Sequence, residues 1–261
     1  MGHFVVFLIL AISCTCYLEP KLFNVQAAEN GYTTTWNSAD GTWYGSPTGY
    51  GSDGGSCGYT NTVGEAPLNS LISSGSTSLY KDGKGCGTCY KVKCSVNEYC
   101  SGESITVVIT DSGVSETNRP HFDLSGTSFG ALAKSGQAEA LRNAGTIELE
   151  YQRTTCDYKG TPLTFTVDTG ANDEYFATLI EYVGGSGELS AVYMKESASE
   201  EWLLMDHSWG ALWKRSSSTH LVAPFWFKLV DDANKTLVAE NVIPTGWAPG
   251  VSYKSAVSTF T

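Results

Sequence analysis

The sequence predicts a mainly β protein of two domains, and its cysteine distribution, strand pattern and scarcity of helix support this. Every cysteine lies in the first 156 residues. Disulfides can therefore cross-link the first half of the chain but not the second, which has no cysteine. The second half alternates short apolar segments with turn residues, a spacing typical of a β-sandwich. Helical periodicity is confined to the stretch between residues 125 and 145.

Composition narrows the classes of ligand. Of the 261 residues, 41% are hydrophobic and 16% are charged, which is enough apolar material for real cores and argues against wholesale disorder. Lys+Arg 16 against Asp+Glu 27 gives a net charge of −11. Nucleic-acid binding is disfavoured because phosphate neutralisation needs cationic clusters, and membrane contact would be peripheral at most. A neutral ligand is compatible with this charge.

The first residues resemble a secretory signal. Phe4 to Ile12 is an unbroken apolar run, far shorter than the ~20 residues that span a bilayer. Small residues follow at Ala27 and Ala28 and offer a cleavage point, so residues 1–28 are predicted to be a signal peptide. The alternative is a buried N-terminal strand. We expect the mature chain to be secreted, extracellular and monomeric.

Cysteines after the predicted signal peptide indicate three disulfides, because six of them in a secreted chain form an even set. Six cysteines allow about 15 pairings, and spacing alone does not choose among them. A zinc or redox pair at Cys86 and Cys89 is the alternative, but the remaining spacings do not supply a second metal-binding pair. The six are Cys57, Cys86, Cys89, Cys94, Cys100 and Cys156. We therefore expect a cross-linked domain over 29–155, a linker over 156–161 and a second domain over 162–261.

In the first domain a glycine-rich stretch precedes the predicted strands. Residues 42–59 are expected to form a loop because glycine does not hold a helix. Ser125 is a possible N-cap for a helix carrying Phe129, and a second short helix over 138–143 would end at Gly145. The predicted strands are 89–94, 104–110 and 146–153.

The second domain shows strands only, separated by turn residues such as Gly184-Gly185 and Asp231-Asp232. Asn234-Lys235-Thr236 is a lone glycosylation sequon on one of these turns, so Asn234 is a predicted glycosylation site. The predicted strands are 163–167, 176–183, 189–194, 202–205, 224–230 and 236–242.

Two carboxylates stand out as chemical candidates. Asp111 closes the strand SITVVIT, and Asp123 lies within His121-Phe122-Asp123-Leu124. Carboxylates at strand ends near an aromatic-rich loop are compatible with sugar chemistry. The alternative, which spacing alone favours, is that Asp123 caps the following helix and Asp111 caps a turn. The four histidines have no metal-binding spacing, and the sequence indicates neither a metal site nor a cofactor.

Aromatic residues are the second candidate feature. Trp43 and Tyr44 lie in the glycine-rich stretch, where a core role is less expected. Sugar rings have an apolar face that packs on an aromatic plane, so exposed aromatics in a row make a polysaccharide platform. The alternative is a sandwich core, which also needs aromatics. The aromatics of the second half are Tyr175, Tyr182, Trp202, Trp209, Trp213, Trp226 and Trp247.

Several blocks in this order resemble the β-expansins, the plant wall-loosening family that includes the group-1 grass pollen allergens. The resemblance runs over essentially the whole mature chain. It implies a double-psi β-barrel followed by an immunoglobulin-like β-sandwich, with one groove across both. It also implies the disulfides Cys57–Cys86, Cys89–Cys156 and Cys94–Cys100. The blocks are TWYG at 42–45, GGSCGY at 54–59, KDGKGCGTCY at 81–90, ITD at 109–111, HFDLSG at 121–126, SWGALW at 208–213 and VIPTGW at 242–247.

The barrel implied by the resemblance is similar to that of small inverting endoglucanases, which need an acid and a base carboxylate. Asp123 matches the position of the acid, whereas the stretch from Thr42 to Pro47, where the base is expected, contains no carboxylate. Asp111 is not an evident substitute. We therefore expect no sustained hydrolysis and no enzymatic activity.

The resemblance implies non-hydrolytic loosening of plant cell walls through contacts with cellulose, xylan or another matrix glycan. A weak endoglucanase or transglycosylase, or a purely carbohydrate-binding defence module, are the alternatives. Pollen members are typically basic, so the acidic charge favours a vegetative member. The residues expected to contact polysaccharide are Thr42, Trp43, Tyr44, His121, Tyr175, Tyr182 and Trp209, with Asp111 and Asp123 as catalytic-like carboxylates.

Overall fold

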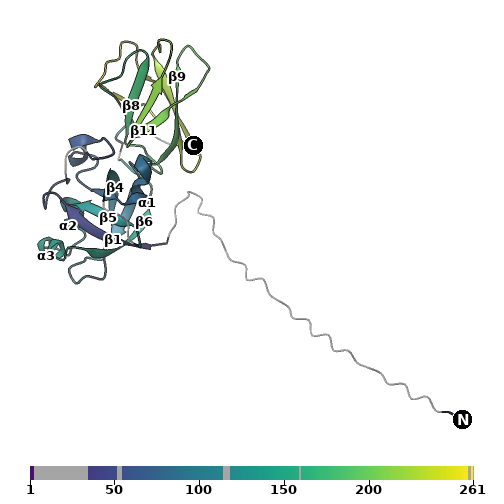
Figure 1. Ribbon diagram of the computed structural model, residues 1–261. Helices are drawn as coiled ribbons and strands as arrows, with labels where there is room; N and C mark the ends of the chain where they lie inside the picture. The colour runs from purple at the N-terminus through teal and green to yellow at the C-terminus, as the bar shows by residue number, and fades with distance from the viewer. Residues whose placement is uncertain (3–34, 52–54, 114–117, 159, 258–259, 261) are drawn as a thin grey trace.

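A computed structural model shows two β units in series, joined by a short connection (Figure 1). It describes residues 35–51, 55–113, 118–158 and 160–257, together with Met1, Gly2 and Phe260. The predicted signal peptide and its cleavage point fall almost entirely outside this range. Within the described residues, no helix has the length and apolar character needed to cross a membrane.

The first unit is a closed six-stranded barrel with the strand order β1-β5-β2-β4-β3-β6, which confirms the predicted barrel. Strands β1 and β5, and likewise β2 and β4, run parallel, while the other neighbours are antiparallel. The strands are β1 (Asn37–Tyr44), β2 (Ile72–Gly75), β3 (Cys89–Lys93), β4 (Ile105–Ser112), β5 (His121–Ser125) and β6 (Ile147–Arg153).

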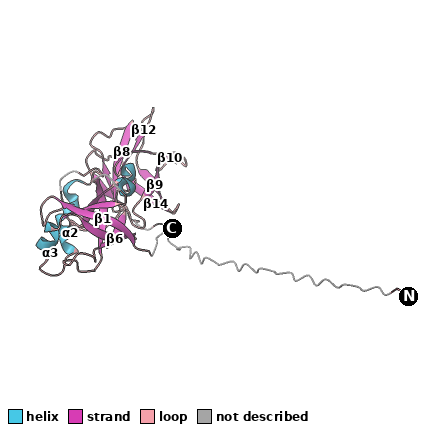
Figure 2. Ribbon diagram, turned by 60° about the horizontal axis from the view of Figure 1, so that its bottom comes forward, coloured by secondary structure: helices cyan, strands magenta, loops and turns pink. Residues whose placement is uncertain are grey.

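The barrel interior is filled by inward-facing apolar side chains, including Val107, Ile109, Phe122, Leu124 and Leu149, all fully buried. Two short helices, α2 (Gly126–Ala131) and α3 (Ala138–Asn143), lie together at one edge of the barrel (Figure 2). The predicted N-cap of α2 is confirmed, since the Ser125 hydroxyl accepts a 2.9 Å hydrogen bond from the Ser128 amide. Phe129 of α2 and Leu141 of α3 extend the barrel core.

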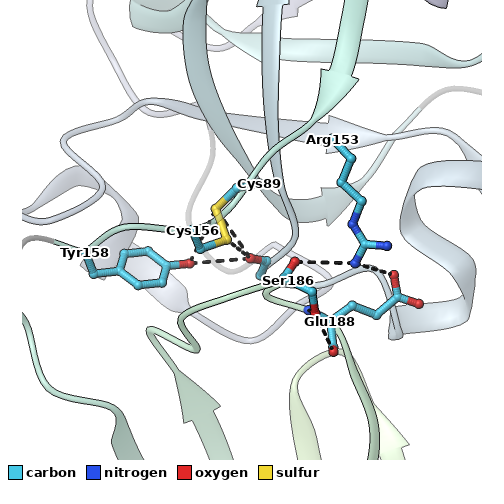
Figure 3. The surroundings of a disulfide bond; sticks show 7 residues. Cys89, Arg153, Cys156, Tyr158, Ser186 and Glu188 are labelled. Atoms are coloured by element: carbon cyan, nitrogen blue, oxygen red, sulfur yellow. Dashed lines mark hydrogen bonds and ion pairs between the residues drawn. A yellow bond between two sulfur atoms is a disulfide. The ribbon is translucent and has the colours of Figure 1, made fainter. Parts of the chain in front are cut away.

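Three disulfides cross-link the barrel and its exit. They join Cys57 to Cys86, Cys89 to Cys156, and Cys94 to Cys100, the pairing that the family resemblance implies. Each closed loop stabilises the fold by roughly 2–4 kcal/mol. The Cys89–Cys156 bridge fastens the chain where it leaves the barrel (Figure 3).

The second unit is a sandwich of two sheets, β10-β9-β13-β14 and β11-β12-β8-β7-β15, as predicted. Phenylalanine rings dominate its core, where Phe165, Phe176, Phe225 and Phe227 are fully buried and pack against one another. The strands are β7 (Thr164–Val167), β8 (Tyr175–Glu181), β9 (Leu189–Glu196), β10 (Leu203–Leu204), β11 (Asp206–Trp209), β12 (Leu212–Ser216), β13 (Phe225–Asp231), β14 (Thr236–Ile243) and β15 (Ser252–Lys254).

Strand β1 corrects one expectation. Thr42 to Tyr44 was predicted as loop, but these residues end an eight-residue strand that pairs with both β5 and β6. Its sequence, NSADGTWY, has low strand propensity, and pairing on both sides compensates for this. The glycine at position 41 is needed for packing, because a Cβ there would lie 2.5 Å from Leu149 Cδ1.

Candidate functional site

Parallel pairing of β1 with β5 brings three predicted site residues together. Thr42 lies opposite Asp123, and the Thr42 hydroxyl donates a 2.6 Å hydrogen bond to Asp123 Oδ1. The same hydroxyl lies 2.8 Å from His121 Nε2, so it bridges the carboxylate and the imidazole. Because Thr42 donates to Asp123, His121 must donate its Nε2 proton to Thr42. Asp123 does not cap α2, since Ser125 fills that role.

The imidazole of His121 is half-buried beside this carboxylate. Burial lowers its pKa below the ordinary value of 6.5, although the charges of Asp123 and Asp40 act in the opposite direction. The ring is therefore neutral at neutral pH and gains its charge only under acidic conditions. Asp40 is held by Arg119, whose Nη2 lies 2.7 Å from the Asp40 carboxylate.

Asp111 organises the backbone at the end of β4. Its Oδ1 accepts hydrogen bonds from the Ser56 amide at 2.6 Å and from the Ser112 amide at 2.8 Å. The turn-capping interpretation of Asp111 therefore describes part of its role. Through Ser56, this carboxylate fixes the barrel loop that contacts the second domain at Gly58.

The Tyr44 phenol lies close enough to both Asp111 and Asp123 to be affected by their charges. Burial raises its pKa above 10, a hydrogen bond with Ser74 opposes this, and the charges of Asp111 and Asp123 raise it further. The hydroxyl therefore stays protonated and can donate a hydrogen bond. Gly51, at φ +96°, packs so closely that a Cβ there would lie 2.2 Å from the Tyr44 ring. We call Thr42, Tyr44, Asp111, His121 and Asp123 the carboxylate cluster.

Trp43 does not share the face of its neighbours. Successive side chains of a strand point to opposite sides, and Trp43 packs against the barrel core while Thr42 and Tyr44 join the carboxylate cluster. The Trp43 indole N–H donates to the Arg142 carbonyl at 3.2 Å, and the Arg142 guanidinium lies over its ring. The indole thus supports the corner formed by α2 and α3.

Two predicted contact residues lie on the outward face of the five-stranded sheet. Trp209 is 50% exposed, and Tyr175 is partly exposed at the start of β8. Through the pairing of β12 with β11 and β8, Trp209 lies level with Leu179, four residues along β8 from Tyr175. Four residues of strand correspond to about 13 Å. We call Tyr175 and Trp209 the platform.

Tyr182, also predicted to contact polysaccharide, lies elsewhere. It follows β8 with φ +59°, and its ring packs edge-on against Tyr158 at 5.6 Å between centroids. Its hydroxyl is hydrogen-bonded to Thr62 of the barrel. Tyr182 therefore belongs to the junction between the domains and is separate from the platform.

The other tryptophans of the second half fall into two groups. Trp213 is buried in the sandwich core, and the partly buried Trp247 packs against this core. Trp226 lies on β13 of the other sheet and Trp202 directly precedes β10, and the Lys195 ammonium lies 4.4 Å and 5.3 Å from their respective ring centroids. The core interpretation is thus correct for Trp213 and Trp247, whereas Trp202 and Trp226 are partly exposed, as Tyr175 is.

A three-residue segment joins the cluster to the platform. Ser56 binds Asp111, and Gly58, two residues later, lies under Trp209. A Cβ at position 58 would stand 3.0 Å from Trp209 Cη2 and 3.1 Å from Leu179 Cδ1. Three residues span at most about 10 Å, so the cluster and Trp209 are close neighbours across the domain boundary. Spacing alone did not single out Ser56, Gly58 or Ser74, although the first two lie in the GGSCGY block.

Asn234 is exposed at the turn between β13 and β14, with φ +62°. Among the described residues, no group of three or more His, Cys, Asp or Glu side chains is arranged to hold a metal ion.

Family models match both domains. Residues 163–244 match the expansin C-terminal domain, and residues 72–151 match a model described as lytic transglycolase. The chain is 47% identical to putative expansin-B2 of Arabidopsis thaliana, over 95% of this chain and 92% of that protein. It is 51% identical to expansin-B11 of Oryza sativa subsp. japonica, over 87% of this chain and 79% of that protein.

Three further proteins are similar to this chain. Pollen allergen Phl p 1 of Phleum pratense is 42% identical over 86% of each chain. The crystal structure of apo-Clavibacter michiganensis expansin superposes with a TM-score of 0.65 at 20% identity, covering 85% of this chain and 96% of that one. A mutant of that bacterial protein, solved in complex with cellohexaose, gives the same TM-score at 19% identity, covering 85% and 97%. At such identities the structural likeness concerns the fold.

Proposed function

This chain belongs to the β-expansin family, whose members loosen plant cell walls, and from this premise we propose how its two domains act on a glycan. The family is generally non-enzymatic despite its barrel domain. We propose that one neutral wall polysaccharide lies across the carboxylate cluster and the platform at the same time. The cellohexaose complex of the bacterial homologue supports a β-glucan as the class of ligand.

The carboxylate cluster supplies polar contacts for sugar hydroxyls. Asp123 and Asp111 accept hydrogen bonds, and the protonated Tyr44 phenol donates one. Hydrogen bonds to charged groups contribute about 1.5–3 kcal/mol where water is excluded. Because Thr42 and Ser56 hold the two carboxylates in place, little ordering is needed when the glycan binds.

The platform supplies stacking. The exposed Trp209 and Tyr175 rings offer aromatic planes to the apolar faces of sugar rings. Their spacing of about 13 Å along the strand direction lets both rings contact the same extended chain. Stacking without a requirement for particular hydroxyls tolerates variation in the sugar sequence.

We infer that binding does not lead to sustained cleavage, because the stretch where the base is expected contains no carboxylate. Inversion requires a base carboxylate about 6.5–9.5 Å from the acid, with a water molecule between them. The Thr42–Pro47 stretch contains no carboxylate, and Asp111 is engaged by two backbone amides. Losing positioned proton transfer removes roughly 10²–10⁴-fold in rate. Asp123 then acts as a hydrogen-bonding group.

Loosening follows from competition between two sets of non-covalent contacts. Stacking and hydrogen bonds to the protein replace the lateral contacts that a glycan makes with its neighbours. Wall tension then moves the released chain, so the slip is not reversed when the protein dissociates. Because homologues of this chain are cell-wall proteins, we propose that it is secreted and acts in the wall.

The observation that carries this proposal is the position of Trp209, exposed and directly above Gly58 of the barrel. The test is constant-load creep of heat-killed wall strips with wild type, Trp209→Ala and Trp202→Ala. Trp202 is the matched control because it lies beside the other sheet, against Lys195. We expect Trp209→Ala to lose most of the creep and Trp202→Ala to retain it. Wild-type creep by Trp209→Ala would contradict the proposal.

A further inference from the structure

Four charged side chains, contributed alternately by the two domains, meet at the domain junction. Lys81 and Arg153 come from the barrel, and Glu188 and Asp232 come from the sandwich. Glu188 Oε2 lies 2.7 Å from Lys81 Nζ and 3.1 Å from Arg153 Nη2, while Arg153 Nη1 pairs with Asp232. Figure 3 shows the Arg153–Glu188 pair beside the Cys89–Cys156 disulfide.

Glu188 is the central member of this ion network. The residue is 8% exposed, and its carboxylate is the only one of the network paired with two barrel cations among the described residues. A buried carboxylate is strongly disfavoured unless its charge is compensated. Lys81 and Arg153 must therefore both stay close to Glu188 in the folded protein. Arg153 Nη2 also donates to the Ser186 carbonyl at 3.4 Å, which adds a second link to the same segment of the sandwich.

The network lies beside the apolar contact of the junction, because the Cys89–Cys156 disulfide belongs to the same apolar cluster. Ala211 and Leu179 of the sandwich pack against Cys57 and Tyr59 of the barrel in one apolar cluster. The ions also border a hollow of about 480 Å³ lined by residues that include Arg153, Tyr158 and Asp232. A backbone hydrogen bond of 3.0 Å from the Ala211 amide to the Cys57 carbonyl also crosses the junction. The paired charges add further directional restraints on the angle between the domains, which the non-directional apolar contact does not supply.

A short chain of contacts leads from Glu188 to the platform. Lys81 begins the turn that reaches Gly83, and a Cβ at Gly83 would stand 2.7 Å from the Gly210 amide nitrogen. Gly210 follows Trp209 directly, and His207 Nε2 donates to its carbonyl at 2.8 Å. The barrel segment Lys81–Gly83, which Glu188 holds through an ion pair, is therefore the segment that contacts the turn after Trp209.

From this arrangement we infer that Glu188 is a positioning residue that keeps the platform in line with the carboxylate cluster. The inference rests on the proposed function, because it assumes that one glycan contacts both. When the domains are held in line, binding of the second half of a glycan is intramolecular and gains from a high effective concentration. When the ion network is broken, the angle between the domains is less tightly restrained and that gain decreases.

The effect has a signature in ligand length. A glycan too short to span both domains binds one domain only, so its affinity does not depend on their alignment. A six-sugar glycan contacts both domains, so its affinity does depend on it. Loss of Glu188 should therefore weaken binding of long ligands and leave binding of short ligands unchanged, a pattern that general destabilisation does not produce.

The experiment measures cellotriose and cellohexaose affinities by NMR titration for wild type, Glu188→Gln and Glu150→Gln. Glu150 is the matched control, because it pairs with Lys93 at 3.2 Å within the barrel alone. We expect wild type and Glu150→Gln to prefer cellohexaose, and Glu188→Gln to lose roughly tenfold of that preference, a part of the 10²–10⁴-fold that linkage can provide. Cellotriose affinity should be equal in all three proteins.

Lys81→Gln is the second variant, because its side chain is 37% exposed and its loss leaves less buried charge unpaired. It should reproduce the effect, and Lys81→Arg should restore the preference. An unchanged ratio of affinities in Glu188→Gln and Lys81→Gln, with wild type still preferring cellohexaose, would overturn the positioning role while leaving the proposed function intact. Equal affinity of wild type for both ligands would overturn the inference and also the proposal that one glycan lies across both domains.

Discussion

The indole of Trp209, in the sandwich, lies directly on Gly58, in the barrel. Gly58 has φ +88°, and a Cβ there would stand 3.0 Å from the indole carbon Cη2. The bare backbone at this position is what allows the two domains to meet beneath an aromatic ring that is half exposed. The platform therefore begins at the edge of the carboxylate cluster, because Ser56, two residues earlier, binds Asp111.

Gly58→Ala should displace the Trp209 ring and weaken glycan binding several-fold. The substitution also costs about 1 kcal/mol of folding stability, because alanine disfavours positive φ. Gly136→Ala is the control, since Gly136 has φ +77° with nothing within 4 Å of an added Cβ. Both variants should melt slightly earlier than wild type, and only Gly58→Ala should lose affinity for insoluble cellulose. Equal losses of affinity would count against the role of this contact.

Thr42→Val should reduce wall creep with little change in fold. Valine keeps the shape of threonine but removes the hydroxyl that joins His121 to Asp123, leaving both without their shared partner. A lost hydrogen bond of this kind costs about 1 kcal/mol. Thr42→Ser retains the hydroxyl and should creep normally. The idea fails if Thr42→Val extends wall strips as fast as wild type.

Glu181 should make the protein more stable at acidic pH. Its carboxyl is buried on β8, and burial raises its pKa above the ordinary 4.5, while the hydrogen bond from Thr166 acts in the opposite direction. Since the folded-state pKa is the higher one, this contribution is fully present below about pH 4.5 and is lost as the pH rises through the folded value.

Glu181→Gln imitates the protonated form, so it should flatten this pH dependence and increase stability at neutral pH. Urea unfolding between about pH 4 and pH 8 measures both effects. An identical decline in the free energy of unfolding for wild type and Glu181→Gln would assign the pH dependence to other groups.

Asn234 should carry an N-linked glycan when the chain is secreted from plant cells. It lies exposed at the tip of the β13–β14 turn, within the Asn-Lys-Thr sequon. Intact-mass measurement before and after enzymatic deglycosylation should show a loss of mass that Asn234→Gln lacks. A secreted wild-type chain with its unmodified mass would refute the assignment.

Local pattern was sufficient where strands alternate and pack on their own faces. The sandwich follows from apolar residues such as Phe165, Phe225 and Phe227 at alternate positions between turn residues. Strand β1 did not follow, because its glycine, asparagine and aspartate favour turns, and only its pairing with β5 and β6 makes it a strand. Pairing between segments about 80 residues apart leaves no local signal.

The sequence was sufficient to predict most residues of the candidate site, but it did not predict how their side chains are arranged. Spacing alone favoured a helix cap for Asp123, and it was the family resemblance that grouped it with Thr42 and Tyr44. The resemblance also placed Trp43 and Tyr182 among the contacts. The alternation of β1 places the half-buried Trp43 on the opposite face from Thr42 and Tyr44, against the barrel core, and Tyr182, with its positive φ, lies at the domain junction. Side-chain direction at a strand end depends on twist and local φ, which composition does not reveal.

The central claim is that binding, without bond cleavage, loosens the wall, and creep measured together with released reducing ends tests it most directly. Heat-killed wall strips under constant load would be treated with the purified protein while the bathing solution and the wall glucans are assayed for new chain ends. We predict sustained extension with no increase in reducing ends above the buffer control. Reducing ends that accumulate in proportion to extension would contradict the account.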